Sequence, residues 1–273
     1  MADSVPGRDA RRKVVAARQM FRRRRPYNSC MNHIRLLPFA AADGPTNMAA
    51  DEALLETARD TGVASLRFYA WSEPTVSLGY FQPAEVRRTP NLEALAWVRR
   101  STGGATIVHH HELTYSFALP ASAPRSPESW ICRFHRLVRA VVAERGVPSK
   151  LVVCGAEQKL GDVLCFLHHT PGDLAVNGSK IAGSAQRKQH GALLQHGSLL
   201  LNRSEFAPEL PGVNDLAAGT AVAGDELAAE LAARFAAECG AEVRPGEWTA
   251  AELARVPEIK AEKYANPEWN HRR

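Results

Sequence analysis

Short apolar runs separated by turn residues dominate the pattern of hydrophobic and polar positions, and they predict more strands than helices. The predicted strands lie at about residues 32–39, 65–70, 75–79, 95–99, 104–109, 113–119, 149–153, 162–166, 173–176, 179–184 and 191–201. The predicted helices cover about residues 45–60, 127–145, 224–239 and 249–255. Strands that pair through hairpins, with helices interspersed, predict an α+β (mixed α/β) fold in which helices pack on a mixed, largely antiparallel β-sheet.

End signals mark two of the predicted helices. The helix at 127–145 has Ser126 as its expected N-cap, Pro127 as its first residue and Gly146 just past its end. The helix at 249–255 opens with the Thr249 to Glu252 spacing of a capping box. Both helices are therefore expected to begin at defined residues.

A hairpin is the strongest local prediction in residues 173–184. An Asn177–Gly178 pair separates two short runs, which is the usual signal for a two-residue turn between antiparallel strands. The second run carries one lysine, Lys180, in a small and otherwise uncharged stretch that ends at residues 183–185. Small residues let a ligand approach the backbone closely, so Lys180 faces either such a ligand or solvent at the edge of the sheet.

A second segment, residues 99–109, combines positive charge with paired glycines. Arg99 and Arg100 end one predicted strand, and Thr102, Gly103 and Gly104 form a turn before the next strand. Exposed backbone N–H groups beside arginine suit a carboxylate, a phosphate or an acyl phosphate. An ordinary loop with solvated arginines is the alternative for this segment taken alone.

Composition excludes several protein classes. The 273 residues are 45% hydrophobic and 23% charged, which is ordinary for a globular protein. No apolar stretch approaches the roughly 18–20 residues of a membrane span. The five cysteines are widely spaced and contain no CxxC pair, so they predict neither a disulfide framework nor a zinc site, and Cys132 and Cys154 are expected to be buried and structural. A reducing cytoplasm is the expected compartment.

The net charge of +5 is unevenly distributed. Residues 1–30 carry nine Lys and Arg against two Asp, which leaves a net charge of −2 on residues 31–273. The body therefore shows no sign of binding nucleic acid. We expect residues 1–30 to be a disordered basic tail, or to precede a true start at Met31, and residues 31–273 to form a single catalytic domain.

Ordered sequence blocks resemble the lipoate/octanoate branch of the biotinyl–lipoyl protein ligase and transferase family. These blocks lie at residues 47–54, 67–71, 74–82, 99–104, 180–186, 196–200 and 263–270. They extend over roughly residues 31–270, and several blocks in one order are more specific than any single motif. The resemblance implies the catalytic-domain fold of that family, which is like that of class II synthetases.

Cys165 distinguishes between the members of this branch. Octanoyltransferases and octanoyl amidotransferases carry a Cys-Phe pair and then an acid-Leu pair just before the lysine hairpin, whereas ligases that use ATP generally lack the cysteine. Here the two pairs are Cys165–Phe166 and Asp173–Leu174. The resemblance therefore implies that Cys165 accepts the acyl group as a thioester, and that Lys180 stabilises the carbonyl oxygen and favours the thiolate.

The resemblance also implies a binding pocket. Its expected residues are Arg100, Thr102, Gly103, Gly104, Ala105 and His109 on one side, and Gly183, Ser184, Ala185, Gln186, His196 and Gly197 on the other. ATP-using relatives have a third glycine where this chain has Ala105, which slightly weakens an adenylate pocket. His109 and His111 would share one face of a strand, but spacing supplies no third ligand, so no metal site is expected.

The implied activity is octanoyl transfer in protein lipoylation. The expected donor is octanoyl-acyl carrier protein, and the expected acceptor is the lysine of an apo lipoyl domain or of the glycine-cleavage H protein. Exchange of a thiolate with a thioester is nearly isoenergetic, so this reaction requires no cofactor. The residue that takes the proton from the acceptor lysine stays open between Lys180 and a nearby histidine.

Three alternatives remain. An octanoyl amidotransferase would move the acyl group between lipoyl domains through the same cysteine. An ATP-dependent lipoate–protein ligase would need ATP and Mg²⁺, and Cys165 would then be incidental. A degenerate carrier-binding or regulatory protein is disfavoured because Lys180, the Gly-Gly turn and Cys165 occur together.

Overall fold

The computed structural model describes residues 31–124, 126–217 and 222–273. The expected basic tail, residues 1–30, lies outside this described part. No helix in the described ranges is long and apolar enough to cross a membrane.

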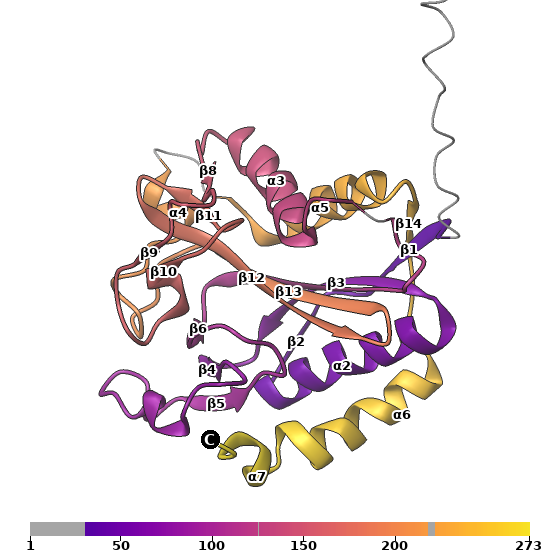
Figure 1. Cartoon of the computed structure of the whole chain (residues 1–273), viewed down its shortest axis with the longest axis horizontal. Coiled ribbons are helices and arrows are strands. Elements are labelled where there is room, and N and C mark those ends of the chain that lie inside the picture. The colour runs from indigo at the N-terminus through magenta and orange to yellow at the C-terminus, as the bar shows by residue number, and fades with distance from the viewer. Residues whose placement is uncertain (1–30, 125, 218–221) are drawn as a thin grey trace, which may run out of the picture.

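A nine-stranded sheet forms the centre of the molecule (Figure 1). Its order is β14-β1-β3-β7-β13-β12-β11-β8, with β2 paired to β3. Pairs along β3-β7-β13-β12-β11-β8 are antiparallel, whereas β1, β2 and β14 join in parallel. The strands are β1 (His33–Leu36), β2 (Ala40–Ala42), β3 (Ala64–Trp71), β7 (Glu112–Leu119), β8 (Lys150–Leu151), β11 (Leu174–Val176), β12 (Ser179–Gln189), β13 (Ala192–Leu200) and β14 (Glu242–Pro245). The predicted mixed, largely antiparallel sheet is confirmed.

Two smaller sheets flank the main one. One consists of β4 (Thr75–Leu78), β5 (Ala96–Arg99) and β6 (Ile107–His109), and the other of β9 (Gln158–Lys159) and β10 (His168–His169). β4 lies between β5 and β6, parallel to the first and antiparallel to the second. The glycine segment after β5 therefore crosses the end of β4 and does not join neighbouring strands.

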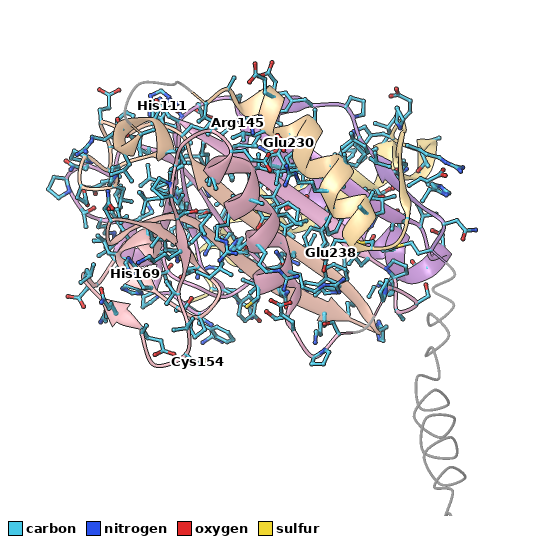
Figure 2. The ribbon with its side chains drawn as sticks, turned by 90° about the horizontal axis from the view of Figure 1, so that it is seen from above. His111, Arg145, Cys154, His169, Glu230 and Glu238 are labelled. Carbon is cyan, nitrogen blue, oxygen red and sulfur yellow. The ribbon has the colours of Figure 1, made fainter. Side chains whose placement is uncertain are left out.

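Helices cover both faces of the main sheet (Figure 1). The helices α3 (Trp130–Ala143) and α5 (Gly224–Glu238) lie on one face, and α2 (Gly44–Thr61) and α6 (Ala250–Ile259) lie on the other. Shorter helical segments complete the fold: α4 (Val213–Leu216), α7 (Pro267–Asn270), 3-10 turns at Ala84–Arg87 and Cys165–Leu167, and a π-helical turn at Lys260–Tyr264. Figure 2 shows Arg145 and Glu230 where α3 and α5 meet, and their side chains form an ion pair at 2.8 Å.

Two local predictions were wrong. The helix predicted at 127–145 is α3, and it begins at Trp130. Ser129 rather than Ser126 is its N-cap, because the Ser129 hydroxyl accepts a hydrogen bond from the Cys132 N–H. The expected strand at 162–166 contributes only a bridge from Leu164 to Thr106, because the chain then turns through a 3-10 segment. The capping box of α6, between Thr249 and Glu252, is confirmed.

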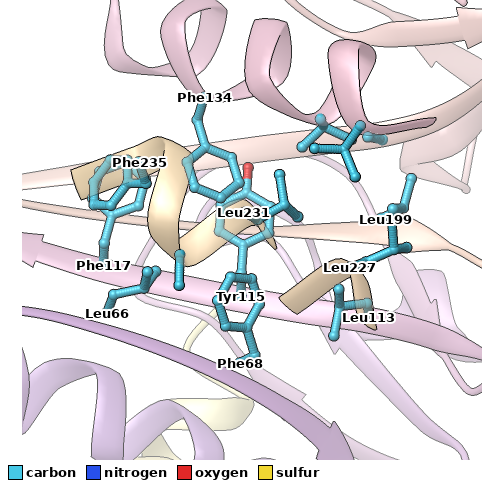
Figure 3. Close-up of a cluster of buried hydrophobic side chains, with 14 of the residues drawn as sticks. Leu66, Phe68, Leu113, Tyr115, Phe117, Phe134, Leu199, Leu227, Leu231 and Phe235 are labelled. Atoms are coloured by element: carbon cyan, nitrogen blue, oxygen red, sulfur yellow. The ribbon is translucent and has the colours of Figure 1, made fainter. Parts of the chain in front are cut away.

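An aromatic core lies between α3, α5 and the sheet (Figure 3). The ring of Tyr115 stacks on Phe134 at 4.1 Å, and the ring of Phe117 lies 4.5 Å from Phe235. Phe117, Phe134 and Phe235 are completely buried. This packing fixes α3 over β7, and both elements contribute polar side chains to the site described below.

Truncation of this core should destabilise the fold. We expect Phe235→Ala to lower the free energy of unfolding by about 3–5 kcal/mol, because a buried ring is replaced by a cavity. Urea denaturation followed by far-UV circular dichroism measures the change. Phe39→Ala is the control, since Phe39 is 59% exposed and should change stability by no more than about 0.5 kcal/mol. Equal effects of the two substitutions would contradict this view of the core.

Candidate functional site

The predicted lysine hairpin is confirmed. Asn177 and Gly178 both adopt positive φ, +49° and +83°, and Val176 pairs with Ser179 across the turn. Positive φ at both central residues is what a type I′ turn requires, and an Asn-Gly pair meets it at low cost. The register shift between Leu174 and Ala175 marks an irregularity in β11, next to the acidic residue that contacts Lys180.

Lys180 is buried and points into the protein rather than toward solvent. Its Nζ lies 2.8 Å from Asp173 Oδ2 and donates to the His168 carbonyl at 3.0 Å and to the Cys165 carbonyl at 3.4 Å. The Cys165 Sγ lies 3.9 Å from the same nitrogen. Gly183 makes room for this arrangement, because a Cβ there would lie 2.6 Å from the Lys180 Cε.

Asp173 is the partner that lets a lysine remain buried here. Its Oδ2 also accepts hydrogen bonds from the N–H and the hydroxyl of Thr170, at 2.7 and 2.9 Å. Both charged side chains are almost completely buried, at 3% exposure for Lys180 and 4% for Asp173. A buried charge without a partner is costly, so the ion pair holds Lys180 at this place. The sequence identified Asp173 only as part of the cysteine motif and did not assign it this role.

Cys165 begins the 3-10 turn rather than ending a strand. Its backbone N–H donates to the Thr106 carbonyl at 2.7 Å, which fixes the turn to β6 and its preceding loop. Its side chain is half-buried, whereas Cys154, expected to be buried, is exposed. A Cβ at Gly104 would lie 3.9 Å from the Cys165 Sγ, so the glycine loop lies directly beside the thiol.

Arg100 supports the glycine loop from within. Its guanidinium donates to the Ser77 carbonyl at 2.7 Å, to the Gly103 carbonyl at 3.2 Å and to the Ala105 carbonyl at 2.9 Å. Burial lowers the pKa of Arg100 to about 10. Its contacts are thus mostly to the protein itself, and its main role is to hold the loop rather than to offer a free charge to an anion. Gly79 permits the contact with this loop, because a Cβ there would lie 1.8 Å from the Gly104 carbonyl oxygen.

One cavity brings most of the predicted residues together. Its walls contain Arg100, Gly103, Gly104, His109, Cys165, Gly183, Ser184, Ala185, His196 and Gly197. Residues that the sequence analysis did not assign to the pocket also line it: the apolar or aromatic Met48, Tyr69, Trp71, Ile107 and Phe166, and the hydroxyl-bearing Thr114 and Ser198. Together these residues surround the thiol with a mostly apolar enclosure, which suits an uncharged acyl chain.

Four predicted pocket or site residues do not line this cavity. Lys180 lies 3.9 Å from the Cys165 Sγ but does not line the cavity itself. The Ala105 carbonyl accepts a hydrogen bond from Arg100, and the Thr102 hydroxyl bonds the His196 Nε2 at 2.7 Å. Gln186 differs most, because its side chain donates to Gln195 at 2.7 Å and borders a separate surface hollow near α3.

The two histidines of the cavity are held by buried carboxylates. His109 bonds Glu112 through Nδ1 at 2.7 Å and Ser77 through Nε2 at 2.6 Å, and its ring stacks on Trp71 at 3.8 Å. Burial lowers the pKa of His109, and the charge of Glu112 opposes that effect. His196 bonds Asp51 through Nδ1 at 2.9 Å. The Nε2 of His196 bonds the Thr102 hydroxyl, so both ring nitrogens of each histidine have a hydrogen-bond partner.

Buried charges keep the carboxylates ionised. Burial tends to raise the pKa of Asp51, but the charge of Arg67 and the hydrogen bond from His196 outweigh it, so the net shift is downward. Glu112 shows the same balance, with His109 as the main opposing group. Asp51 lies within the sequence block at 47–54 and Glu112 lies at the start of β7, and the contacts of both become visible only in the structure.

A third histidine, His135, was missed by the sequence analysis. It is completely buried on α3, and its Nε2 lies 2.6 Å from the Ser184 hydroxyl and 3.1 Å from the Tyr115 hydroxyl. No motif pointed to it, because it lies on a helix far from both segments that carry the chemistry. Among the described residues, no group of three or more His, Cys, Asp or Glu side chains is placed to hold a metal ion.

The ion pair of Lys180 predicts a specific stability pattern. We expect Asp173→Asn to lower the free energy of unfolding by about 3–5 kcal/mol, since it leaves a buried ammonium group without its counterion. The double variant Asp173→Asn/Lys180→Met should recover part of that loss. Asp162→Asn is the matched control, because Asp162 pairs with Lys159 on the surface, and no measurable change is expected. Urea denaturation of the four proteins checks this, and a double variant less stable than Asp173→Asn would contradict it.

Comparison with known proteins shows the family of this chain. The sequence profile of the lipoyl protein ligase A/B catalytic domain matches residues 43–208. The chain is 33% identical to octanoyltransferase LipM of Geobacillus kaustophilus, with 83% of this chain and 94% of that protein covered. It is 34% identical to octanoyltransferase LipM of Kyrpidia tusciae, with 88% and 98% covered.

Solved structures agree on the fold. A lipoate-protein ligase A bound with ATP superimposes with a TM-score of 0.66 at 23% identity, covering 88% of this chain and 98% of that one. The bi-partite lipoate protein ligase of Thermoplasma acidophilum gives a TM-score of 0.65 at 22% identity, covering 88% and 96%. From the profile match and the sequence relatives, we conclude that the chain belongs to the lipoyl protein ligase A/B catalytic domain family.

Proposed function

We propose that this protein is an octanoyltransferase of protein lipoylation that works through an acyl thioester on Cys165. One observation carries the proposal: a half-buried thiol lies 3.9 Å from a buried ammonium group, at the wall of a mostly apolar cavity. The relatives that cover most of this chain are named octanoyltransferases, which supports the same activity.

In the first step the Cys165 thiolate attacks the carbonyl carbon of an octanoyl thioester. A carbon–sulfur bond forms to the enzyme, the carbon–sulfur bond to the donor breaks, and the donor leaves as a thiolate. The Lys180 ammonium group is close enough to balance the charge of the attacking sulfur. Its bond to the Cys165 carbonyl is the longest of its contacts to oxygen, at 3.4 Å, so that proton can most readily turn toward the developing oxyanion.

In the second step the lysine of an acceptor domain attacks the acyl-enzyme. The product is an amide, which is more stable than a thioester, so the transfer proceeds in one direction. We propose octanoyl-acyl carrier protein as the donor and an apo lipoyl domain or the glycine-cleavage H protein as the acceptor. The thioester supplies the driving force, and neither ATP nor a metal ion takes part in this reaction.

The cavity favours an acyl chain over a charged ligand. Tyr69, Trp71 and Phe166 line it. Arg100 also lines it, but most of the N–H groups of its guanidinium donate to carbonyl oxygens of the protein itself. An acyl adenylate would need positive charge or free N–H groups directed at its phosphate. This difference favours the transferase over the ATP-dependent ligase.

Intact-mass spectrometry with octanoyl-acyl carrier protein, in the absence of ATP, tests the proposal. We expect wild type to gain one octanoyl group and to lose it when an apo lipoyl domain is added. Cys165→Ser should gain none. Cys154→Ser is the control and should behave as wild type, because Cys154 is an exposed cysteine outside the cavity.

Other outcomes would assign another activity. Labelling of the acceptor only after free octanoate or lipoate and Mg-ATP are added would make the protein a ligase and contradict the role of Cys165. Acylation of Cys165 by an octanoylated H protein, but not by the acyl carrier protein, would make it an amidotransferase.

A further inference from the structure

A row of paired residues crosses the main sheet along the cavity that contains Cys165. Gly183 on β12 pairs with Ser198 on β13, and Ser198 pairs in turn with Thr114 on β7. Thr114 then pairs with Tyr69 on β3. All four residues line the cavity. Three strand spacings of about 4.8 Å separate the first residue from the last, so the row is about 14 Å long.

The thiol lies at the Gly183 end of this row. A Cβ at Gly183 would lie 3.0 Å from the Lys180 Nζ, and that nitrogen lies 3.9 Å from the Cys165 Sγ. This end is also the open one, because Cys165 is half-buried and Gly104 beside it is exposed. Tyr69, at the other end, is only 2% exposed. An acyl chain on Cys165 therefore has its carbonyl group at the open end and its methyl end toward Tyr69.

The middle of the row suits a saturated hydrocarbon chain. The hydroxyl groups of Ser198 and Thr114 donate to the Glu112 Oε1, at 2.8 and 2.5 Å. The Thr114 hydroxyl also accepts a hydrogen bond from the Trp71 Nε1 at 2.9 Å. Both hydroxyl protons thus point at a buried carboxylate, and an alkyl chain that lies over these residues breaks no hydrogen bond.

The Tyr69 ring is held in place on two sides. Its hydroxyl donates to the Asp51 Oδ2 at 3.3 Å, and the Arg67 guanidinium lies 3.7 Å from the centroid of the ring. Arg67 in turn donates to the Asn47 Oδ1 at 2.8 Å. The ring cannot turn aside for a longer chain without breaking these contacts.

A second cavity lies beyond Tyr69. It is lined by Tyr69, by Arg67 and by Ala40, the residue on β2 that pairs with Tyr69. Its volume is about 230 Å³, against the roughly 10–15 Å³ that admits one water molecule. Tyr69 therefore stands on the row between two cavities, and it is the one large side chain among Gly183, Ser198, Thr114, Tyr69 and Ala40.

We propose that the Tyr69 ring closes the far end of the acyl pocket and limits the substrate to acyl chains of about eight carbons. The seven carbon–carbon bonds of an octanoyl group, about 1.5 Å each, reach about 9 Å in a zigzag, which leaves about 5 Å of the row for the ring. Tyr69 is thus a residue that determines specificity and not a catalytic one. This inference rests on the proposed function.

The rate at which Cys165 is acylated by carrier proteins of different chain length tests the proposal. Acyl-acyl carrier proteins with six, eight, ten and twelve carbons serve as donors, and rapid quench with intact-mass spectrometry gives each rate. We expect wild type to react at least about tenfold more slowly with twelve carbons than with eight, because a filled pocket rejects added methylenes. In Tyr69→Ala the ratio of the twelve-carbon to the eight-carbon rate should rise at least tenfold, since each newly buried methylene contributes about fourfold.

A graded series separates the ring from its hydroxyl and from general loss of stability. Tyr69→Leu removes less volume and should move the preferred chain to about ten carbons, whereas Tyr69→Phe keeps the ring and should keep the wild-type profile. Tyr264→Leu is the matched control. Tyr264 is also buried and also bonds a carboxylate of α2, that of Glu52, but it lies outside the cavity. It should lose stability without a change in the rate ratio.

Met48→Phe tests the same end of the pocket without removal of the tyrosine. Met48 on α2 lines the cavity and packs in one buried cluster with Tyr69. A larger side chain there shortens the space at the closed end, so the preferred chain should shift toward six carbons. An unchanged profile in Met48→Phe would show that the acyl chain does not extend to this end.

The remaining outcomes also decide the question. The proposal is wrong if neither Tyr69→Ala nor Tyr69→Leu alters the rate ratio, or if wild type reacts equally with eight and twelve carbons. An equal shift in Tyr264→Leu would assign the effect to a loosened core and would also contradict it. If wild type forms no acyl-enzyme with a donor of any length, the proposed function itself fails, which is a distinct result.

Discussion

The buried ion pair between Lys180 and Asp173 is the constraint on which the site depends. A lysine with 3% exposure can stay charged only if a counterion and further acceptors replace water, and the structure supplies one carboxylate and two carbonyl oxygens. One of those carbonyls belongs to Cys165, so the same ammonium group that needs acceptors also holds the backbone of the proposed nucleophile. The type I′ turn sets the start of β12, and through it the face on which Lys180 emerges.

Close backbone approach is the second requirement. Gly79 lies against the Gly104 carbonyl, and Gly183 leaves space for the lysine stem. Gly197 does the same for Ser184, because a Cβ there would lie 2.4 Å from the serine hydroxyl. The glycine loop at 103–104, the start of β12 and the turn that carries Cys165 can therefore pack against one another, because no bulky side chain separates them. The polar groups behind them, such as the buried pair of Asp51 and His196, hold the wall in one arrangement.

Local signals explain what could be predicted from the sequence. The Asn177–Gly178 turn and the capping box of α6 depend on neighbouring residues, and both appear as expected. The N-cap of α3 was placed at Ser126 rather than Ser129, because two serines three residues apart offer the same local signal and packing chooses between them. The sequence blocks placed Cys165 beside Lys180, since they carry a resemblance to a family. The contacts of His135 needed the structure, because only the packing of α3 on the sheet brings its ring to the hydroxyls of Tyr115 and Ser184.

The most direct test of the account is a single-turnover time course with octanoyl-acyl carrier protein, an apo lipoyl domain and excess wild-type enzyme, quenched in acid and resolved by mass. The account predicts that octanoyl appears first on the peptide containing Cys165 and then passes to the lipoyl domain, with a lag in product that matches the life of the acyl-enzyme. Formation of octanoylated lipoyl domain without a lag, or faster than the acyl group leaves Cys165, would show that the thioester is not on the reaction path.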